Sequence, residues 1–397
     1  MLSALIFCLA IRPQKEIDAT TLIGKVLCGY QGWFRTPGDP TGSGWFHWSK
    51  SRNDLGPSTL NVELWPDMSE YPEKTLYPAG SFRYKDGTPA KLYSSVYPEV
   101  VDLHFRWMRQ YGIDGVMVQR FLGGLDGGEG SKREARVLRC VRDAARRTGR
   151  TFAVEYDMSG TPPEKAIDQM KKDWRYLVDT LHITDDPRYL HHKGKPVLEI
   201  FGFFADRFSG KEANAIVDAF DTHDKYAVSL VGAGQWWWRK ETEPEWSRAF
   251  RRFVAYSPWD VGNTGRKDGN MIAPFARWPE DVAEAKKAGM LILPVIYPGF
   301  SWDNLTRKVP GSTIIPRRNG AFFNEQFQAA ADLKIGQAFI AMFDEVDEGT
   351  AIFKVSNDPP TGAHFVTLDG MPSDTYLKLA GQGTKLIHDA NRDLLNR

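Results

Sequence analysis

The chain has 397 residues, 42% of them hydrophobic and 25% charged, which is typical of globular proteins and excludes a disordered, collagen-like or coiled-coil chain. The 51 Lys and Arg residues balance 50 Asp and Glu residues and leave a net charge of +1, so we expect no nucleic-acid partner. Cys8, Cys28 and Cys140 have unrelated spacings, which argues against a disulfide framework and a zinc motif.

The N-terminal residues 1–11, MLSALIFCLAI, form an apolar run about as long as the core of a signal peptide. The run is too short for a membrane span, which needs ~20 residues. No Lys or Arg precedes it and no A-x-A site follows it, so a buried first strand and a misassigned start codon are alternatives. We interpret residues 1–20 as a signal peptide or disordered N-terminus, and we expect a secreted or periplasmic protein with no stable membrane span.

From residue 25 onward, short apolar runs alternate with longer segments that have helical periodicity. Eight runs predict β-strands, and they begin at residues 25, 114, 151, 195, 226, 252, 290 and 337. Helices are predicted over residues 100–112, 135–149, 166–181, 211–220, 278–289 and 324–336, and a last one over 375–390.

This alternation predicts an α/β fold with parallel strands, because nearly continuous apolar strands are buried on both faces and connected by right-handed crossovers. Eight units predict a single (β/α)8 TIM barrel over residues 21–397, with elaborated loops at the C-terminal face. A doubly wound open sheet is the alternative, but no G-x-G-x-x-G motif follows an early strand.

The end of the eighth predicted strand carries four carboxylates in five positions, namely Asp344, Glu345, Asp347 and Glu348. In TIM barrels the chemistry takes place at the C-terminal ends of the strands. Glycoside cleavage needs two carboxyl groups in different protonation states, and neighbouring like charges separate two pKa values. Glu345 and Glu348 are therefore the candidate catalytic residues. A polar surface turn and a metal site are alternatives, but the EF-hand spacing is absent, and we expect neither a metal nor a cofactor.

Aromatic and polar residues follow other strand ends, as expected for a site that binds sugars. The aromatic plane stacks on the C–H face of a sugar, and polar groups bind its hydroxyls. For each Trp, packing in the core is the alternative. The candidate substrate-binding residues of this kind are Tyr30, Trp33, His47, Trp48, Glu155, Asp157, Trp236 and Trp237.

The segment MFDEVDEGTAIFK resembles the E-x-x-E-G-T segment of the endo-acting α-mannosidases of glycoside hydrolase family 99, and of related bacterial xylosidase- or arabinosidase-like proteins of the family 71/99 type. Further similarity lies in GYQGWF, YLHHKGKPVLEIFG, VIYPGFSW and RRNGAFFNEQFQAA, in the same order along the chain.

The resemblance implies a role for each Glu. Glu345 would deprotonate the 2-hydroxyl of the sugar to form a 1,2-anhydro sugar, and Glu348 would protonate the leaving oxygen and then activate water. It also implies that Tyr30 and either Arg317 or Arg318 bind substrate. Tyr297 and Asp344 are further candidate substrate-binding residues, with a structural role as the alternative for Asp344. The chain differs in having Asp344, Val346 and Asp347 where the family typically has Asn, Trp and His, so the identity of the sugar does not carry over.

Together these features predict a secreted glycoside hydrolase that cleaves α-linked oligosaccharides or polysaccharides with retention of configuration. A barrel that binds carbohydrate without turnover is the alternative. A barrel enzyme that uses carboxylates and a metal is a third hypothesis.

Overall fold

The computed structural model describes residues 16–392. The signal-like run of residues 1–11 lies outside the described residues, so signal-peptide function and export stay predictions. Within residues 16–392, no helix combines the length and apolar character needed to cross a membrane.

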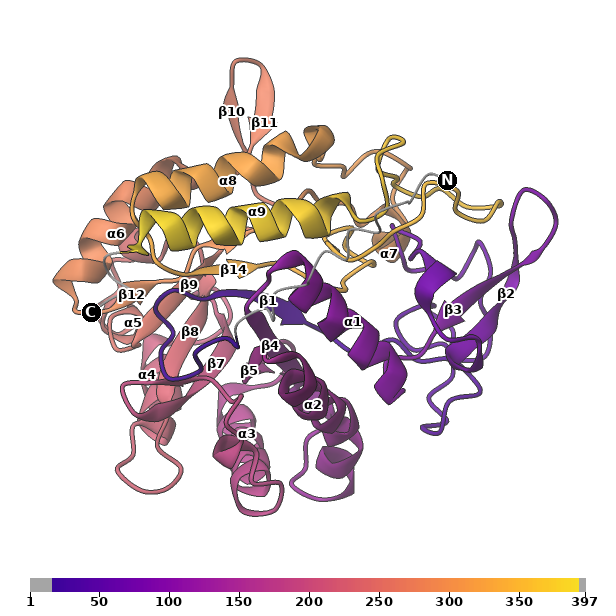
Figure 1. Cartoon of the computed structure of the whole chain (residues 1–397). Coiled ribbons are helices and arrows are strands. Elements are labelled where there is room, and N and C mark those ends of the chain that lie inside the picture. Colours follow the sequence, from indigo (N-terminus) through magenta and orange to yellow (C-terminus); the bar gives the residue numbers. More distant parts are fainter. Residues whose placement is uncertain (1–15, 393–397) are drawn as a thin grey trace, which may run out of the picture.

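The centre of the fold is a curled sheet whose strands pair in the order β12-β9-β8-β7-β5-β4-β1-β14-β13 (Figure 1). All pairs along this path are parallel, and β6 (His191–His192) adds an antiparallel pair to β7. The strands are β1 (Val26–Tyr30), β4 (Gly115–Phe121), β5 (Thr151–Asp157), β7 (Lys195–Phe203), β8 (Ser229–Gln235), β9 (Ala255–Trp259), β12 (Leu291–Ile292), β13 (Val295–Ile296) and β14 (Ala338–Ile340). All eight predicted strands are present, the seventh in two parts, which confirms a mostly parallel α/β architecture.

The seventh predicted strand is divided by Leu293 and Pro294 into β12 and β13. Pro294 has no backbone N–H, so it cannot donate to a neighbouring strand. Its carbonyl still accepts a hydrogen bond from the amide of Phe339 (2.9 Å). The amide of Leu293 donates to the backbone carbonyl of Tyr256 (2.8 Å). One short segment therefore contacts β9 on one side and β14 on the other.

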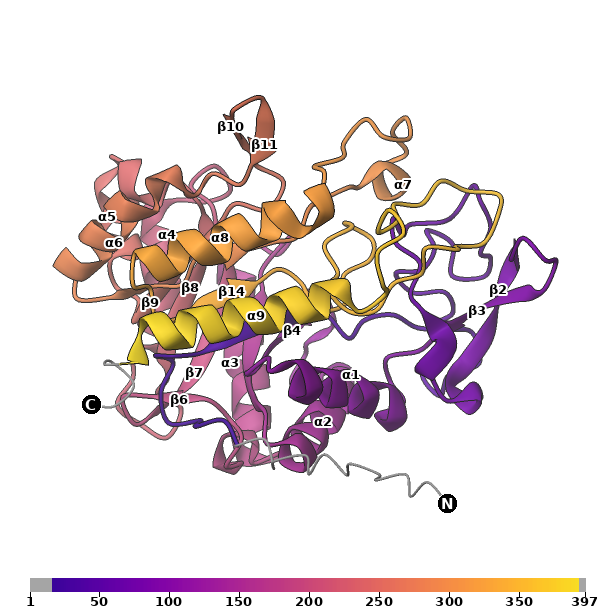
Figure 2. The same cartoon turned by 45° about the horizontal axis from the view of Figure 1, so that its top comes forward.

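Helices lie around the outside of the sheet, and α8 and α9 run side by side (Figures 1 and 2). The predicted helices correspond to α1 (Pro98–Tyr111), α2 (Glu129–Thr148), α3 (Pro163–Asp179), α4 (Gly210–Phe220), α6 (Trp278–Lys287), α8 (Ala321–Asp332) and α9 (Thr375–Ala390). Helices α1 and α2 end at Gly112 and Gly149, which adopt φ of 84° and 67° at the C-cap. Only glycine reaches this region without strain, which explains the Gly before the next strand.

The sequence patterns did not predict the short helices α5 (Pro244–Phe250) and α7 (Asp303–Thr306), or two hairpins. One hairpin pairs β10 (Gly265–Lys267) with β11 (Asn270–Ile272), and the other pairs β2 (Leu76–Arg83) with β3 (Pro89–Tyr93). The β2–β3 hairpin belongs to a long connection over residues 31–97, and it projects away from the sheet (Figures 1 and 2). This connection matters for function because its first part lines a cavity beside the end of β14.

Candidate active site

Asp344 joins the end of β14 to the end of β1. Its carboxylate accepts hydrogen bonds from the backbone amides of Gln31 (2.8 Å) and Gly32 (2.9 Å). Asp344 is fully buried, and this burial raises its pKa to about 7. Both carboxylate oxygens therefore hold backbone groups, and the residue positions the two strand ends relative to each other.

Glu345 is the next residue, and its side chain is 7% exposed. The side-chain amide of Gln31 donates a hydrogen bond to Glu345 Oε2 at 3.0 Å. Burial raises the pKa of Glu345 well above its usual range, and the neighbouring Glu348 raises it further. The donor from Gln31 opposes this shift because it stabilises the ionised form.

Glu348 lies one turn further along the chain and is half-buried. Burial raises its pKa to about 7, and repulsion from Asp347 and Asp157 acts in the same direction. Glu345 and Glu348 are close enough to influence each other's ionisation. Two like charges in a buried site are costly, so the pair retains a proton near neutral pH.

Asp347 is hydrogen bonded to His47 from the long first connection, with 3.1 Å between Oδ2 and Nδ1. The His47 ring stacks on Trp33 with 3.5 Å between ring centroids, and Trp33 also stacks on Phe121 at 5.0 Å. His47 has a φ of 60°, a left-handed conformation that is unfavourable for a non-glycine residue. The hydrogen bond and the stacking hold this conformation and bring two predicted substrate-binding residues, Trp33 and His47, to the end of β14.

Asp157 ends β5 and belongs to the same group of carboxylates, because it contributes to the raised pKa of Glu348. It accepts hydrogen bonds from Gln119 Nε2 (2.8 Å) and from the amide of Ser159 (2.7 Å). Burial also raises the pKa of Asp157.

Glu155 lies two residues earlier in β5 and is fully buried next to Glu199 of β7. All four carboxylate oxygens of this second pair lack a hydrogen-bond partner among the described residues. Burial raises the pKa of Glu155 well above its usual range and that of Glu199 to about 8. Glu155 was predicted to bind substrate, and in the structure it is completely buried within β5, beside Glu199 of β7.

Two predicted aromatic ligands, Tyr30 and Trp48, are fully buried and have partners within the protein. The hydroxyl of Tyr30 is hydrogen bonded to His104 Nδ1 (2.9 Å), and the indole of Trp48 donates to the carbonyl of Tyr93 (3.1 Å). Both side chains pack in the core, which for Trp48 is the alternative given in the sequence analysis.

Arg317 supports the loop that follows Glu348. The guanidinium is buried and donates from Nη2 to the carbonyls of Gly349 (2.9 Å) and Ala351 (2.8 Å). Arg318 instead pairs with Glu325 on α8 at 2.5 Å. Of the two arginines left open by the sequence, Arg317 is therefore the one that contacts the loop of the carboxylates, through the backbone.

The remaining predicted residues lie elsewhere around the sheet. Tyr297 is buried and its hydroxyl donates to the carbonyl of Asn263. Trp236 stacks with Arg277 at 4.2 Å, and Trp237 is 46% exposed. The structure gives neither Trp a contact with the carboxylates at the end of β14.

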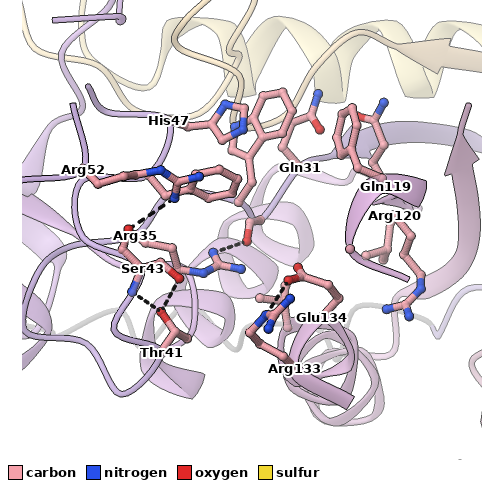
Figure 3. A pocket seen from close by; sticks show the side chains of 18 residues that line it. Gln31, Arg35, Thr41, Ser43, His47, Arg52, Gln119, Arg120, Arg133 and Glu134 are labelled. Atoms are coloured by element: carbon pink, nitrogen blue, oxygen red, sulfur yellow. Dashed lines mark hydrogen bonds and ion pairs between the residues drawn. The ribbon is translucent and has the colours of Figure 1, made fainter. Parts of the chain in front are cut away.

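A cavity of about 520 Å³ lies beside these carboxylates, and Figure 3 shows the side chains that line it. Its wall includes Gln31, His47 and Gln119, which are hydrogen bonded to Glu345, Asp347 and Asp157, respectively. Three of the carboxylates are thus linked to the cavity through one side chain each. Among the side chains that the structure describes, no group of three or more His, Cys, Asp or Glu residues is arranged to hold a metal ion.

Gln31, Gln119, Arg35 and Arg52 are not among the predicted site residues. Gln31 stands between Tyr30 and Trp33 in a strand end that was already selected, so position alone could have indicated it. Arg35 and Arg52 line the cavity but lie in the long connection, for which the sequence gives no periodic signal.

Comparisons with known proteins support the fold. No family model and no curated protein match the chain. Two solved structures of the GH99 endo-alpha-mannosidase from Bacteroides thetaiotaomicron, one in complex with bis-tris-propane, superpose with a TM-score of 0.69. They are 20% and 19% identical in sequence, and the alignments cover 94% of this chain and 100% of the other. A structure described as a glycoside hydrolase-like protein has a TM-score of 0.51 at 13% identity and covers 85% of this chain and 98% of its own. The resemblance to family 99 is confirmed at the level of the fold.

Proposed function

We propose that this protein is a glycoside hydrolase that cleaves α-linked glycans with retention of configuration, using Glu345 and Glu348. The observation that carries the proposal is a pair of neighbouring glutamates with raised pKa values, one of which, Glu348, acts on the other, Glu345, at a strand end beside a cavity. A pair that holds one proton near neutral pH has one group able to accept a proton and one able to donate it. The shared fold with the GH99 endo-alpha-mannosidase supports the same conclusion.

In the proposed reaction, Glu345 takes the proton of the sugar 2-hydroxyl, and the 2-oxygen attacks the anomeric carbon. The bond to the leaving oxygen breaks, and Glu348 donates its proton to that oxygen. Glu348 then takes a proton from water, whose oxygen opens the 1,2-anhydro ring at the anomeric carbon, and Glu345 returns its proton to the 2-oxygen. The anomeric carbon is inverted twice, so its configuration is retained.

The hydrogen bond from Gln31 supports this division of roles. Gln31 Nε2 donates to Glu345 at 3.0 Å, which stabilises the ionised form that a base requires and opposes the burial that raises the pKa of Glu345 well above its usual range. Glu348, with a pKa of about 7, can carry the proton that an acid requires. Asp347, held by His47, raises the pKa of Glu348 and so acts on the acid rather than on the sugar.

The first test is hydrolysis of a panel of plant, yeast and bacterial polysaccharides, with released sugars followed by mass spectrometry. Glu345→Gln and Glu348→Gln are expected to lower the rate by ~10²- to 10⁴-fold, the usual contribution of a general acid or base. Glu280→Gln is the matched control, because the side chain of Glu280 is 68% exposed and pairs only with Arg239 at the surface. Activity close to wild type in both site variants would end the assignment.

The second test concerns the internal nucleophile. A 2-deoxy analogue of the substrate lacks the hydroxyl that Glu345 deprotonates, so we expect almost no turnover. NMR of the first-formed anomer should show retention. Rapid cleavage of the analogue, or an inverted first product, would remove the assigned roles from both glutamates even if hydrolysis were observed.

Binding of carbohydrate without turnover is the second candidate. It is favoured by the burial of Glu345 and by the position of the cavity, whose wall includes Gln31 and His47 but neither glutamate. Glycan-array binding without any product would support it.

We also infer that the sheet closes into the eight-stranded barrel expected from the sequence. The support is the segment Leu291–Ile296, whose two parts pair with β9 and with β14. In such a barrel the ends of β5 and β14 open at the same face, which agrees with the interaction between Asp157 and Glu348.

A further inference from the structure

Arg35 lies in the wall of the cavity and is 6% exposed. Its guanidinium donates from Nη1 to the carbonyls of Gly32 (2.6 Å) and Phe34 (3.1 Å). Within the described part of the chain it forms no direct ion pair; burial lowers its pKa, and the more distant carboxylates of Glu134 and Asp39 oppose this shift only in part. A buried cation without a direct counterion is costly, and a bound anion would offset that cost.

Arg52 comes from the same connection and also lines the cavity. Its guanidinium lies over the ring of Phe46 at 3.8 Å and donates from Nη1 to the carbonyl of Ser43 at 3.2 Å. Arg52 is exposed and likewise has no ion-pair partner among the described side chains, which leave out that of Glu129. The stacking and the hydrogen bond orient the guanidinium before any ligand arrives, which lowers the entropy lost on binding.

The other charged residues of the wall are already paired. Arg120 forms a buried ion pair with Asp173 (2.6 Å), and Arg133 contacts Glu134 (3.2 Å). Arg35 and Arg52 lie on the same side of the cavity, with Ser43 and Thr41 next to them (Figure 3). Two unpaired guanidinium groups near hydroxyl groups are well suited to bind a planar carboxylate or a sulfate.

The cavity also adjoins the proposed catalytic pair, because Gln31 belongs to its wall and donates to Glu345. A sugar unit in the cavity would therefore lie next to the unit undergoing cleavage. We propose that this cavity is a subsite for an anionic sugar, one that carries a carboxylate or a sulfate, and that Arg35 and Arg52 bind the charged group. The inference rests on the proposed function and narrows its substrate class to acidic glycans.

The test is calorimetric binding to the full-length Glu348→Gln variant, which prevents turnover, using two matched pairs of ligands. Tetragalacturonate is compared with its fully methyl-esterified form, and sulfated isomaltotetraose with isomaltotetraose, so the members of each pair share one sugar backbone and only one member carries the anionic groups. We expect the charged member of at least one pair to bind more tightly, by about tenfold or more for one ionic hydrogen bond. The pair that shows the preference distinguishes a carboxylate from a sulfate.

Adding Arg52→Gln should remove most of that preference, and Arg52→Glu should reverse it. Arg35→Lys is the milder change at the buried position, and its folding is checked by thermal unfolding. Arg248→Gln is the matched control, since Arg248 is 61% exposed and pairs with Glu245 away from the cavity. The preference should also weaken with added salt.

Equal or weaker binding of both charged ligands, or a preference that survives Arg52→Glu, would overturn the inference. These results differ from a failure of the proposed function. Charge-dependent binding with no hydrolysis by the wild-type protein would support the anionic-sugar subsite and contradict the proposed hydrolase activity. Hydrolysis of neutral glycans at a rate that substitutions of Arg52 do not change would support the hydrolase activity and contradict the subsite.

Discussion

Glu345 and Glu348 follow β14, whereas Glu155 and Glu199 lie side by side within β5 and β7. Burial raises the pKa of all four carboxyl groups. The surroundings differ, because Glu345 receives a hydrogen bond from Gln31 and adjoins the cavity wall, whereas Glu155 and Glu199 have no partner among the described residues. A raised pKa therefore does not identify a catalytic carboxylate by itself, and the neighbouring donor and cavity make the distinction.

The largest expected difference between the two pairs is in activity. Glu348→Gln should lower kcat/KM by ~10²-fold or more because it removes the proton donor. Glu199→Gln, an identical chemical change in the interior pair, should keep activity within about tenfold. Steady-state kinetics of both variants on the same substrate measure the contrast. Equal losses in the two variants would mean that the interior pair takes part in the reaction.

The second expectation concerns stability against pH. The pKa of Glu199 in the folded protein is about 8, above the ~4.3 of an unfolded chain, so the folded state holds a proton that the unfolded state releases. The contribution of protonated Glu199 to the free energy of unfolding is therefore fully present at low pH and is lost as the pH rises from about 4 to 8. Glu199→Gln removes this loss and should be more stable than wild type by about 4 to 5 kcal/mol at pH 8, but not at pH 4. Urea unfolding at both pH values tests this, and a difference that does not depend on pH would contradict it.

The third expectation isolates the donor that distinguishes the two pairs. Gln31→Leu keeps the size of the side chain but removes the hydrogen bond to Glu345, so the pKa of Glu345 should rise further. A base must be deprotonated, and the low-pH limb of the kcat/KM profile should therefore move to higher pH, with a loss of about tenfold at neutral pH. Gln328→Leu, on the exposed side of α8, is the control. An unchanged profile would show that Gln31 does not stabilise the charge of Glu345.

The smallest effect is expected from a change at Arg317, which supports the loop that follows Glu348. Arg317→Lys keeps the charge, but the shorter side chain holds its ammonium further from the carbonyls of Gly349 and Ala351, which both accept from Nη2 in the wild type. We expect a loss of about 1 kcal/mol in the free energy of unfolding and a lower kcat with little change in KM, because the loop orients Glu348. Thermal unfolding together with kinetics separates the two effects. A higher KM at constant kcat would indicate direct contact with substrate instead.

The sequence by itself determined the succession of strands and helices and the clustering of carboxylates after β14. Strand positions could be predicted because buried parallel strands require continuous apolar runs, and the ends of α1 and α2 because a left-handed C-cap requires glycine. The residues Asp344 to Glu348 could be located because they are contiguous in the chain.

Only the tertiary structure decided which other side chains meet them. The sequence favoured Tyr30 and Trp48 as ligands, yet both are buried with partners in the protein. It also left Gln31, Arg35 and Arg52 out of the site. Residues 31–97 fold by packing against distant parts of the chain, such as His47 on Asp347 some 300 positions away. Contacts over such separations depend on how the connection packs against the strand ends, and no local periodicity in the sequence reports that packing.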